Sequence, residues 1–131
     1  MADGSIVAGS ALRMAPTVCL LISDGEFSAS GLSSVIENTL AAGCKFYMTW
    51  GNSADHLHDA VDEILEQHGT RYESVVTTAH RDESPEDTAW FFLNAALPGE
   101  SRVQYCLSYS EHTSAVQKLL ETIENFGIAD S

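Results

Sequence analysis

Basic side chains are scarce in this chain, which carries 6 lysines and arginines against 19 aspartates and glutamates in 131 residues. The formal net charge at neutral pH is therefore −13. A surface this acidic repels nucleic acid and anionic membranes, and a cation or a basic protein suits it better as a partner. Asp3 and Arg13 cancel within residues 1–16, so the whole negative excess belongs to residues 17–131.

Cysteines and long apolar runs are also few. The three cysteines, Cys19, Cys44 and Cys106, are odd in number and form no CxxC motif, so we expect no disulfide framework. No apolar stretch approaches the roughly 20 residues of a membrane-spanning helix, and the N-terminus lacks the pattern of a secretory signal peptide. These absences predict a cytoplasmic protein that has no membrane partner.

Motifs that would fix a reaction are missing as well. The sequence has no GxGxxG or P-loop pattern for phosphate binding and no GxSxG for a serine hydrolase. It also lacks the DxDxT of haloacid dehalogenases. Asp24 follows the first expected strand, as acidic residues do in receiver domains, but the lysine that those domains need at a later strand end is missing. Function must therefore be inferred from where the topology places polar side chains.

Strand-like and helix-like segments alternate regularly along the chain. Residues 17–23 form a continuous apolar run, typical of a strand buried on both faces of a parallel sheet. A helix with a 3.6-residue apolar period follows each expected strand, and serines such as Ser53 and Ser84 are suited to cap these helices. The expected strands are residues 17–23, 45–50, 73–79 and 102–108.

This βαβαβαβα pattern predicts an α/β fold with a four-stranded parallel sheet between two layers of helices. We expect a flavodoxin-like or Rossmann-like three-layer sandwich with the strand order 2-1-3-4. The Gly- and Ser-rich segment 1–16 is expected to be a flexible tail, and residues 17–131 a single domain.

Polar residues follow every expected strand, and the loops after parallel strands gather at one edge of the sheet, where ligands bind. The predicted strand order places the switch point between the first and third strands. The corner within residues 45–68, where the second strand becomes the second helix, is the expected binding site. Its candidate binding residues are Trp50, Gly51, Asn52, His58 and Asp59.

Two overlapping sets of side chains could carry chemistry at that edge. His80, Glu83 and Asp24 are the catalytic candidates, with His80 as a general base or acid and Trp50 as one wall. His58 and Asp59 lie on one helical stripe with Asp55 and Asp62, and could bind a divalent metal together with His80 and Asp24. Zinc, manganese or iron would suit these ligands, although no cofactor is evident. The alternative reading is that this stripe is a solvated helix face.

Aromatic residues cluster in the third expected helix, where Trp90, Phe91 and Phe92 cover most of the circumference. One side must be core, and the remaining ring could form the interface of a homo-oligomer.

Two segments of the chain resemble a family of small bacterial α/β proteins of unknown function. They are GCKFYMTWGNSADHLHDAVDE and VVTTAHRDESPEDTAWFFLNAALP. The chain departs from that family's pattern at Ala54, where a cysteine is usual, and at Ala79, where a tryptophan is usual. The resemblance brings no activity with it. The residues that carry it are Trp50, Gly51, His58, Asp59, His80, Glu83, Ser84, Trp90, Phe91 and Phe92.

Three functions follow from these observations. The first is a binding or regulatory module that uses the carboxyl edge of the sheet to hold an unknown protein or small molecule. The second is a metal-dependent hydrolase or lyase with the His and Asp site. The third is an acidic decoy that blocks a basic nucleic-acid-binding protein. The lack of catalytic signatures favours the first.

Overall fold

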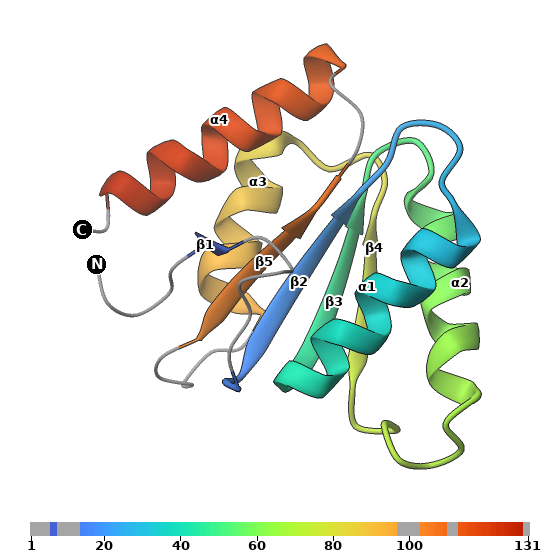
Figure 1. Cartoon of the computed structure of the whole chain (residues 1–131). Coiled ribbons are helices and arrows are strands. Elements are labelled where there is room, and N and C mark those ends of the chain that lie inside the picture. Colours follow the sequence, from blue (N-terminus) through green and yellow to red (C-terminus); the bar gives the residue numbers. More distant parts are fainter. Residues whose placement is uncertain (1–5, 8–13, 97–102, 110–112, 130–131) are drawn as a thin grey trace.

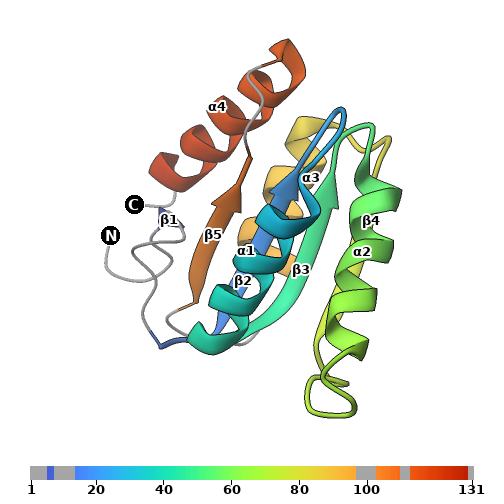
Figure 2. The same ribbon diagram turned by 45° about the vertical axis from the view of Figure 1, so that its right-hand side comes forward.

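The computed structural model describes residues 6–7, 14–96, 103–109 and 113–129. These residues form a parallel five-stranded sheet with helices on both faces (Figures 1 and 2), which confirms the predicted α/β class. The strands are β1 (Ile6–Val7), β2 (Thr17–Ile22), β3 (Cys44–Trp50), β4 (Val76–His80) and β5 (Gln104–Ser108). The helices are α1 (Ala29–Ala42), α2 (Ala54–Glu66), α3 (Pro85–Trp90) with its π-helical continuation η2 (Phe91–Ala95), and α4 (Ser114–Ala129).

The strand order differs from the predicted one. The sheet runs β1-β5-β2-β3-β4, so the four expected strands, numbered along the chain, lie in the order 3-2-1-4. The predicted order 2-1-3-4 is therefore wrong. The third expected strand, β4, lies at the edge because its Val-Thr-Thr-Ala-His sequence is too polar to be buried on both faces. The fourth, β5, takes the inner place beside β2.

This order moves the switch point to the other side of β2. From β2 the chain steps outward through β3 to β4, and then returns to form β5 on the far side of β2. Leu21 in β2 lies opposite Ser108 in β5, so the carboxyl ends of these two strands are nearly level. The crevice expected between the first and third strands therefore lies between β2 and β5.

Each face of the sheet has its own core. Alternate β2 residues Val18, Leu20 and Ile22 pack against α3, η2 and α4, together with Phe92 and Leu119. The intervening residues face α1 and α2. The second core contains Cys19, Leu21, Leu32, Ile36, Leu40, Cys44, Tyr47, Leu57, Val61, Ile64, Leu65 and Cys106.

Serine side chains cap two of the helices, and Ser84 does so as expected. The side chain of Ser28 accepts a hydrogen bond from the Gly31 N–H at the start of α1, and that of Ser84 accepts one from the Asp87 N–H at the start of α3. Ser53 precedes α2 but makes no side-chain cap; its hydroxyl donates to the Gly25 carbonyl instead. That bond ties α2 to the loop that follows β2.

Most of the segment 1–16, the expected tail, lies outside the described residues. Within it, Ile6–Val7 form β1 and pair in parallel with β5. The Ala15 N–H also donates to the Ala42 carbonyl at the end of α1, at 2.9 Å. The boundary between tail and domain at residue 16 stays a prediction.

Candidate functional site

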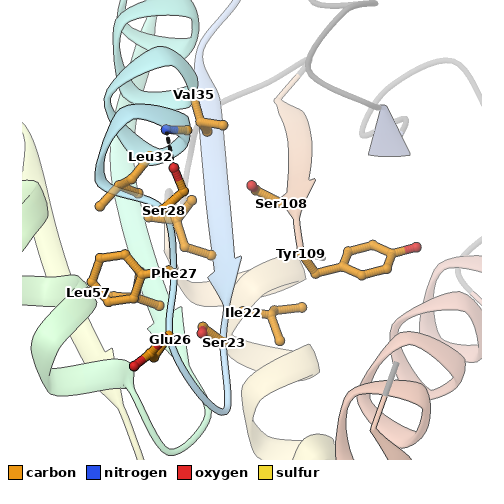
Figure 3. A pocket seen from close by; sticks show the side chains of 12 residues that line it. Ile22, Ser23, Glu26, Phe27, Ser28, Leu32, Val35, Leu57, Ser108 and Tyr109 are labelled. Carbon is orange, nitrogen blue, oxygen red and sulfur yellow. Dashed lines mark hydrogen bonds between the residues drawn. The ribbon is translucent and has the colours of Figure 1, made fainter. Parts of the chain in front are cut away.

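A pocket of about 270 Å³ lies at the carboxyl ends of β2 and β5, beside the first turn of α1 (Figure 3). We refer to it as the switch-point pocket because the strand order reverses here. Its lining comes from both strand ends, from the loop after β2 and from α1 and α2. The lining residues are Leu21, Ile22, Ser23, Glu26, Phe27, Ser28, Gly31, Leu32, Val35, Leu57, Ser108 and Tyr109.

The lining combines an apolar wall with hydroxyl groups. Figure 3 shows Ser28, the cap of α1, and Ser108 of β5 on opposite sides of β2, with Leu32 and Val35 contributed by α1. Tyr109 is 41% exposed, and its ring extends away from α1. Apolar walls with a few fixed polar groups are typical of small-molecule sites.

Among the described lining residues Glu26 alone is charged, and it also borders a second, more open hollow. That hollow is lined by Gly25, Glu26, Phe27, Ser53 and His56. The loop after β2 therefore serves two neighbouring depressions, and Glu26 and Phe27 belong to both.

The expected strand–helix corner is packed tightly onto the loop after β2. Gly51 has φ +110°, in the left-handed region that glycine alone adopts freely. A Cβ at this position would lie 2.8 Å from the Ser23 carbonyl carbon and 2.9 Å from an Asp24 carboxylate oxygen. The Ser23 N–H donates to the Trp50 carbonyl at 3.0 Å, and the Ser53 N–H donates to the Ser23 carbonyl at 3.1 Å. Glycine is required here by both backbone conformation and space.

Asp24 holds three loops together. One carboxylate oxygen accepts a hydrogen bond from the Asn52 N–H at 3.1 Å, and the other accepts one from the Thr113 hydroxyl at 2.8 Å. The Thr113 hydroxyl also accepts from the Val116 N–H, so it caps α4. The two predicted site residues Asp24 and Asn52 therefore meet, in a contact that joins the loops after β2 and β3 to the start of α4.

Trp50 lies inside the protein and forms no wall of an open site. It is 5% exposed, packs in the core beneath α3 and α4, and donates its indole N–H to the Glu83 carbonyl at 3.0 Å. This bond ties the end of β3 to the residue that precedes the cap of α3.

His80 and Glu83, the catalytic candidates at the end of β4, do come together. His80 Nδ1 lies 3.0 Å from Glu83 Oε1, and Nε2 lies 2.7 Å from the Thr78 hydroxyl. The same Glu83 oxygen accepts from the Thr88 hydroxyl at 2.8 Å, and the Phe91 ring covers the imidazole with its centroid 5.1 Å away. The carboxylate orients the imidazole, but it also links β4 to α3 through a half-buried network.

His58 and Asp59 lie on α2 beside β4. His58 Nε2 lies 3.2 Å from the Thr77 carbonyl oxygen, and Nδ1 lies 3.4 Å from an Asp59 oxygen and 3.6 Å from an Asp62 oxygen. Asp55, on the same helix, pairs with Arg81 at 3.6 Å. The predicted stripe therefore exists, and its histidine bridges the two aspartates and the backbone of β4.

Of the four candidate metal ligands, His58 and Asp59 contact each other, whereas Asp24 and His80 bond to other groups. Asp24 bonds Asn52 and Thr113, while His80 bonds Thr78 and Glu83. Within the described part of the chain, no group of three or more His, Cys, Asp or Glu side chains is placed to hold a metal ion. The divalent metal stays a prediction for which these contacts supply no support.

The three cysteines all lie in the core between the sheet and α1 and α2. Cys19 and Cys106 are direct partners on β2 and β5, and a hydrogen bond between them raises the pKa of Cys19, as burial also does, while it lowers that of Cys106. Burial raises the pKa of Cys44 from 9.0 to about 12. These thiols are small core residues without access to a substrate.

The fold is that of an α/β domain with a parallel sheet, and its pocket lies where the strand order reverses. The chain belongs to the family described as Domain of unknown function (DUF7684), whose model matches residues 7–125. The expected membership of a family without known activity is thereby confirmed. No curated protein and no solved structure matches the chain. None of the helices in the described residues has the length and apolar character needed to cross a membrane.

Several pocket residues were not among the candidates, notably Phe27, Val35, Ser108 and Tyr109. The available signal was their position in the sequence, because Ser108 ends an expected strand and Tyr109 opens the loop that follows it at the functional edge. They gain importance only when β5, and not β4, is placed beside β2.

Proposed function

We propose that this domain is a non-catalytic binding module that holds a small molecule in the switch-point pocket. The observation that carries the proposal is the position of the pocket at the carboxyl ends of β2 and β5, where the strand order reverses. Ligands of open α/β sheets bind at this place because the loops diverge there and leave a crevice.

The use of the candidate catalytic groups supports binding over catalysis. Asp24 is held by the Asn52 amide and the Thr113 hydroxyl, and His80 lies under Phe91 between Thr78 and Glu83. None of these carboxylate or imidazole groups lines the pocket. The polar side chains that do line it, among the described residues, are hydroxyls and the Glu26 carboxylate, which can orient a ligand through hydrogen bonds.

The volume and the lining of the switch-point pocket indicate which kind of ligand fits it. A volume of about 270 Å³ lies just below the roughly 300–1,000 Å³ typical of pockets for drug-sized molecules, so a fragment-sized compound fits. Leu32 and Val35 offer an apolar wall, and Ser28 and Ser108 offer hydroxyls on either side of β2. We expect a compact, largely apolar molecule with one or two hydrogen-bonding groups.

A pocket-filling substitution tests this function. Ser108→Phe places a ring where Ser108 now lines the pocket, whereas Ser114→Phe adds the same ring at an exposed position at the start of α4. Compounds from a fragment library that raise the melting temperature of the wild type should raise that of Ser114→Phe and lose their effect on Ser108→Phe. Equal responses of the two variants would reject the pocket as the site.

A further inference from the structure

β4 forms one edge of the sheet, because it pairs with β3 on one side and has no strand on the other in the described part of the chain. Edge strands of soluble proteins are commonly protected by charged side chains, prolines or bulges. The outer surface of β4 instead presents Val76, which is 45% exposed, and Ala79, which is also exposed. No residue of β4 itself carries a carboxylate, lysine or arginine.

The contacts of β4 show which of its backbone groups face outward. The Thr49 hydroxyl of β3 reaches the Thr78 carbonyl at 3.4 Å, so Thr78 directs its backbone groups toward β3. His58 of α2 reaches the Thr77 carbonyl instead. Because these directions alternate along a strand, the backbone groups of Thr77 and Ala79 face away from β3. His58 already occupies one of these carbonyls. In the part of the chain that the structure describes, this leaves the amides of both residues and the Ala79 carbonyl for a further strand.

The two faces beside this edge differ in chemistry. On the α2 face, the His58 imidazole that bonds the Thr77 carbonyl also lies within 3.4 Å of Asp59 and 3.6 Å of Asp62, whose side chains are 85% and 45% exposed. On the opposite face, Val76 lies beside its strand partner Phe46, which belongs to the core beneath α3. A strand added here would meet carboxylates on one face and apolar surface on the other.

We propose that the outer edge of β4 binds an extended segment of a partner protein in which basic and apolar residues alternate. The backbone of the segment would pair with Thr77 and Ala79, its basic side chains would lie beside Asp59 and Asp62, and its apolar side chains would cover Val76. A second copy of this chain fits poorly, since a two-fold axis at β4 would bring the same carboxylates together. The site is separate from the switch-point pocket.

A short peptide of alternating lysine and valine is a direct probe, and its glutamate–valine counterpart is the matched control. The lysine peptide should bind, with an affinity that falls as salt rises, and the glutamate peptide should not. Asp59→Asn with Asp62→Asn should weaken binding about fivefold to tenfold. Glu121→Gln with Glu124→Gln, the same change of charge on exposed positions of α4, should leave it unchanged. Equal losses in the two double variants would overturn the assignment.

Backbone pairing is tested on the peptide itself, which avoids any effect on folding. In an extended peptide all valine amides face one edge and all lysine amides the other. N-methylation of the valines and N-methylation of the lysines should therefore have opposite results, with one peptide losing binding at least tenfold and the other retaining it. Hydrogen exchange of the Ala79 amide should slow when the unmodified peptide binds. Equal binding of both methylated peptides, or unchanged exchange at Ala79, would reject strand addition.

Discussion

The carboxylate of Asp24 accepts a hydrogen bond from the Thr113 hydroxyl, 2.8 Å away, across 89 positions of the sequence. This contact joins the loop after β2 to the start of α4, beside the crevice between β2 and β5. We predict a coupling free energy of about 0.5–1.5 kcal/mol in a double-mutant cycle of Asp24→Asn and Thr113→Val, measured by urea denaturation. Thr113→Val also removes the cap of α4, and the cycle separates that loss from the bond to Asp24. If the effects of the two substitutions are additive, the bond contributes nothing to stability.

Gly51 and Gly69 both have positive φ, but only Gly51 is crowded. Gly51→Ala should lower the free energy of unfolding by about 3 kcal/mol or more, because strain in the left-handed region adds to overlap with Ser23 and Asp24. Gly69→Ala has no atom within 4 Å of the new Cβ and should cost about 1–2 kcal/mol. Similar losses in the two variants would contradict the close packing of the strand–helix corner on the loop after β2.

Glu83 supports His80 and Thr88 through one carboxylate oxygen. Glu83→Ala should destabilise the protein by about 1–3 kcal/mol, because a buried threonine hydroxyl and a largely buried imidazole lose this partner. Glu86→Ala, an exposed position in the first turn of α3, should change stability by less than about 1 kcal/mol. Chemical denaturation of the two variants decides whether this network has the structural role described above.

Burial of Cys44 predicts a loss of stability at alkaline pH. Its pKa rises from 9.0 to about 12 in the folded protein, so the unfolded state releases the thiol proton first. The contribution of the protonated Cys44 thiol to the free energy of unfolding is fully present below pH 9. It is lost as pH rises toward 12, with a slope of about 1.4 kcal/mol per pH unit. Cys44→Ala should reduce the slope measured by urea denaturation between pH about 9 and about 10.5. An unchanged slope would show that this thiol does not ionise on unfolding.

Local patterns predicted the elements of this fold well. The apolar run of β2, the serine caps of α1 and α3, and the close turn at the end of β3 could all be inferred from the sequence. Each depends on chemistry within a few residues, such as a side chain that bonds a neighbouring amide. The parallel α/β class followed from their alternation.

The order of the strands could not be inferred in the same way, because the predicted order 2-1-3-4 and the observed order 3-2-1-4 use similar connections between strands and helices. The discriminating signal was the composition of β4, whose Thr77, Thr78 and exposed Ala79 suit an edge. Once β5 lies beside β2, the functional crevice gains Ser108 and Tyr109. Trp50 could not be placed from sequence either, since it packs beneath α3 and α4 and its indole bonds the Glu83 carbonyl, 33 positions away.

Chemical-shift mapping of fragment binding tests the central claim most directly. Fragments titrated into isotopically labelled protein should shift the amide resonances of Ser28 and Gly31 at the start of α1 and of Ser108 at the end of β5, which line the switch-point pocket together. The same fragments should leave the resonances of His80 and Glu83 unchanged. Fragment shifts that cluster around His80 and Glu83, or no binding near α1 and β5, would contradict the proposal that this domain holds a small molecule at the switch point.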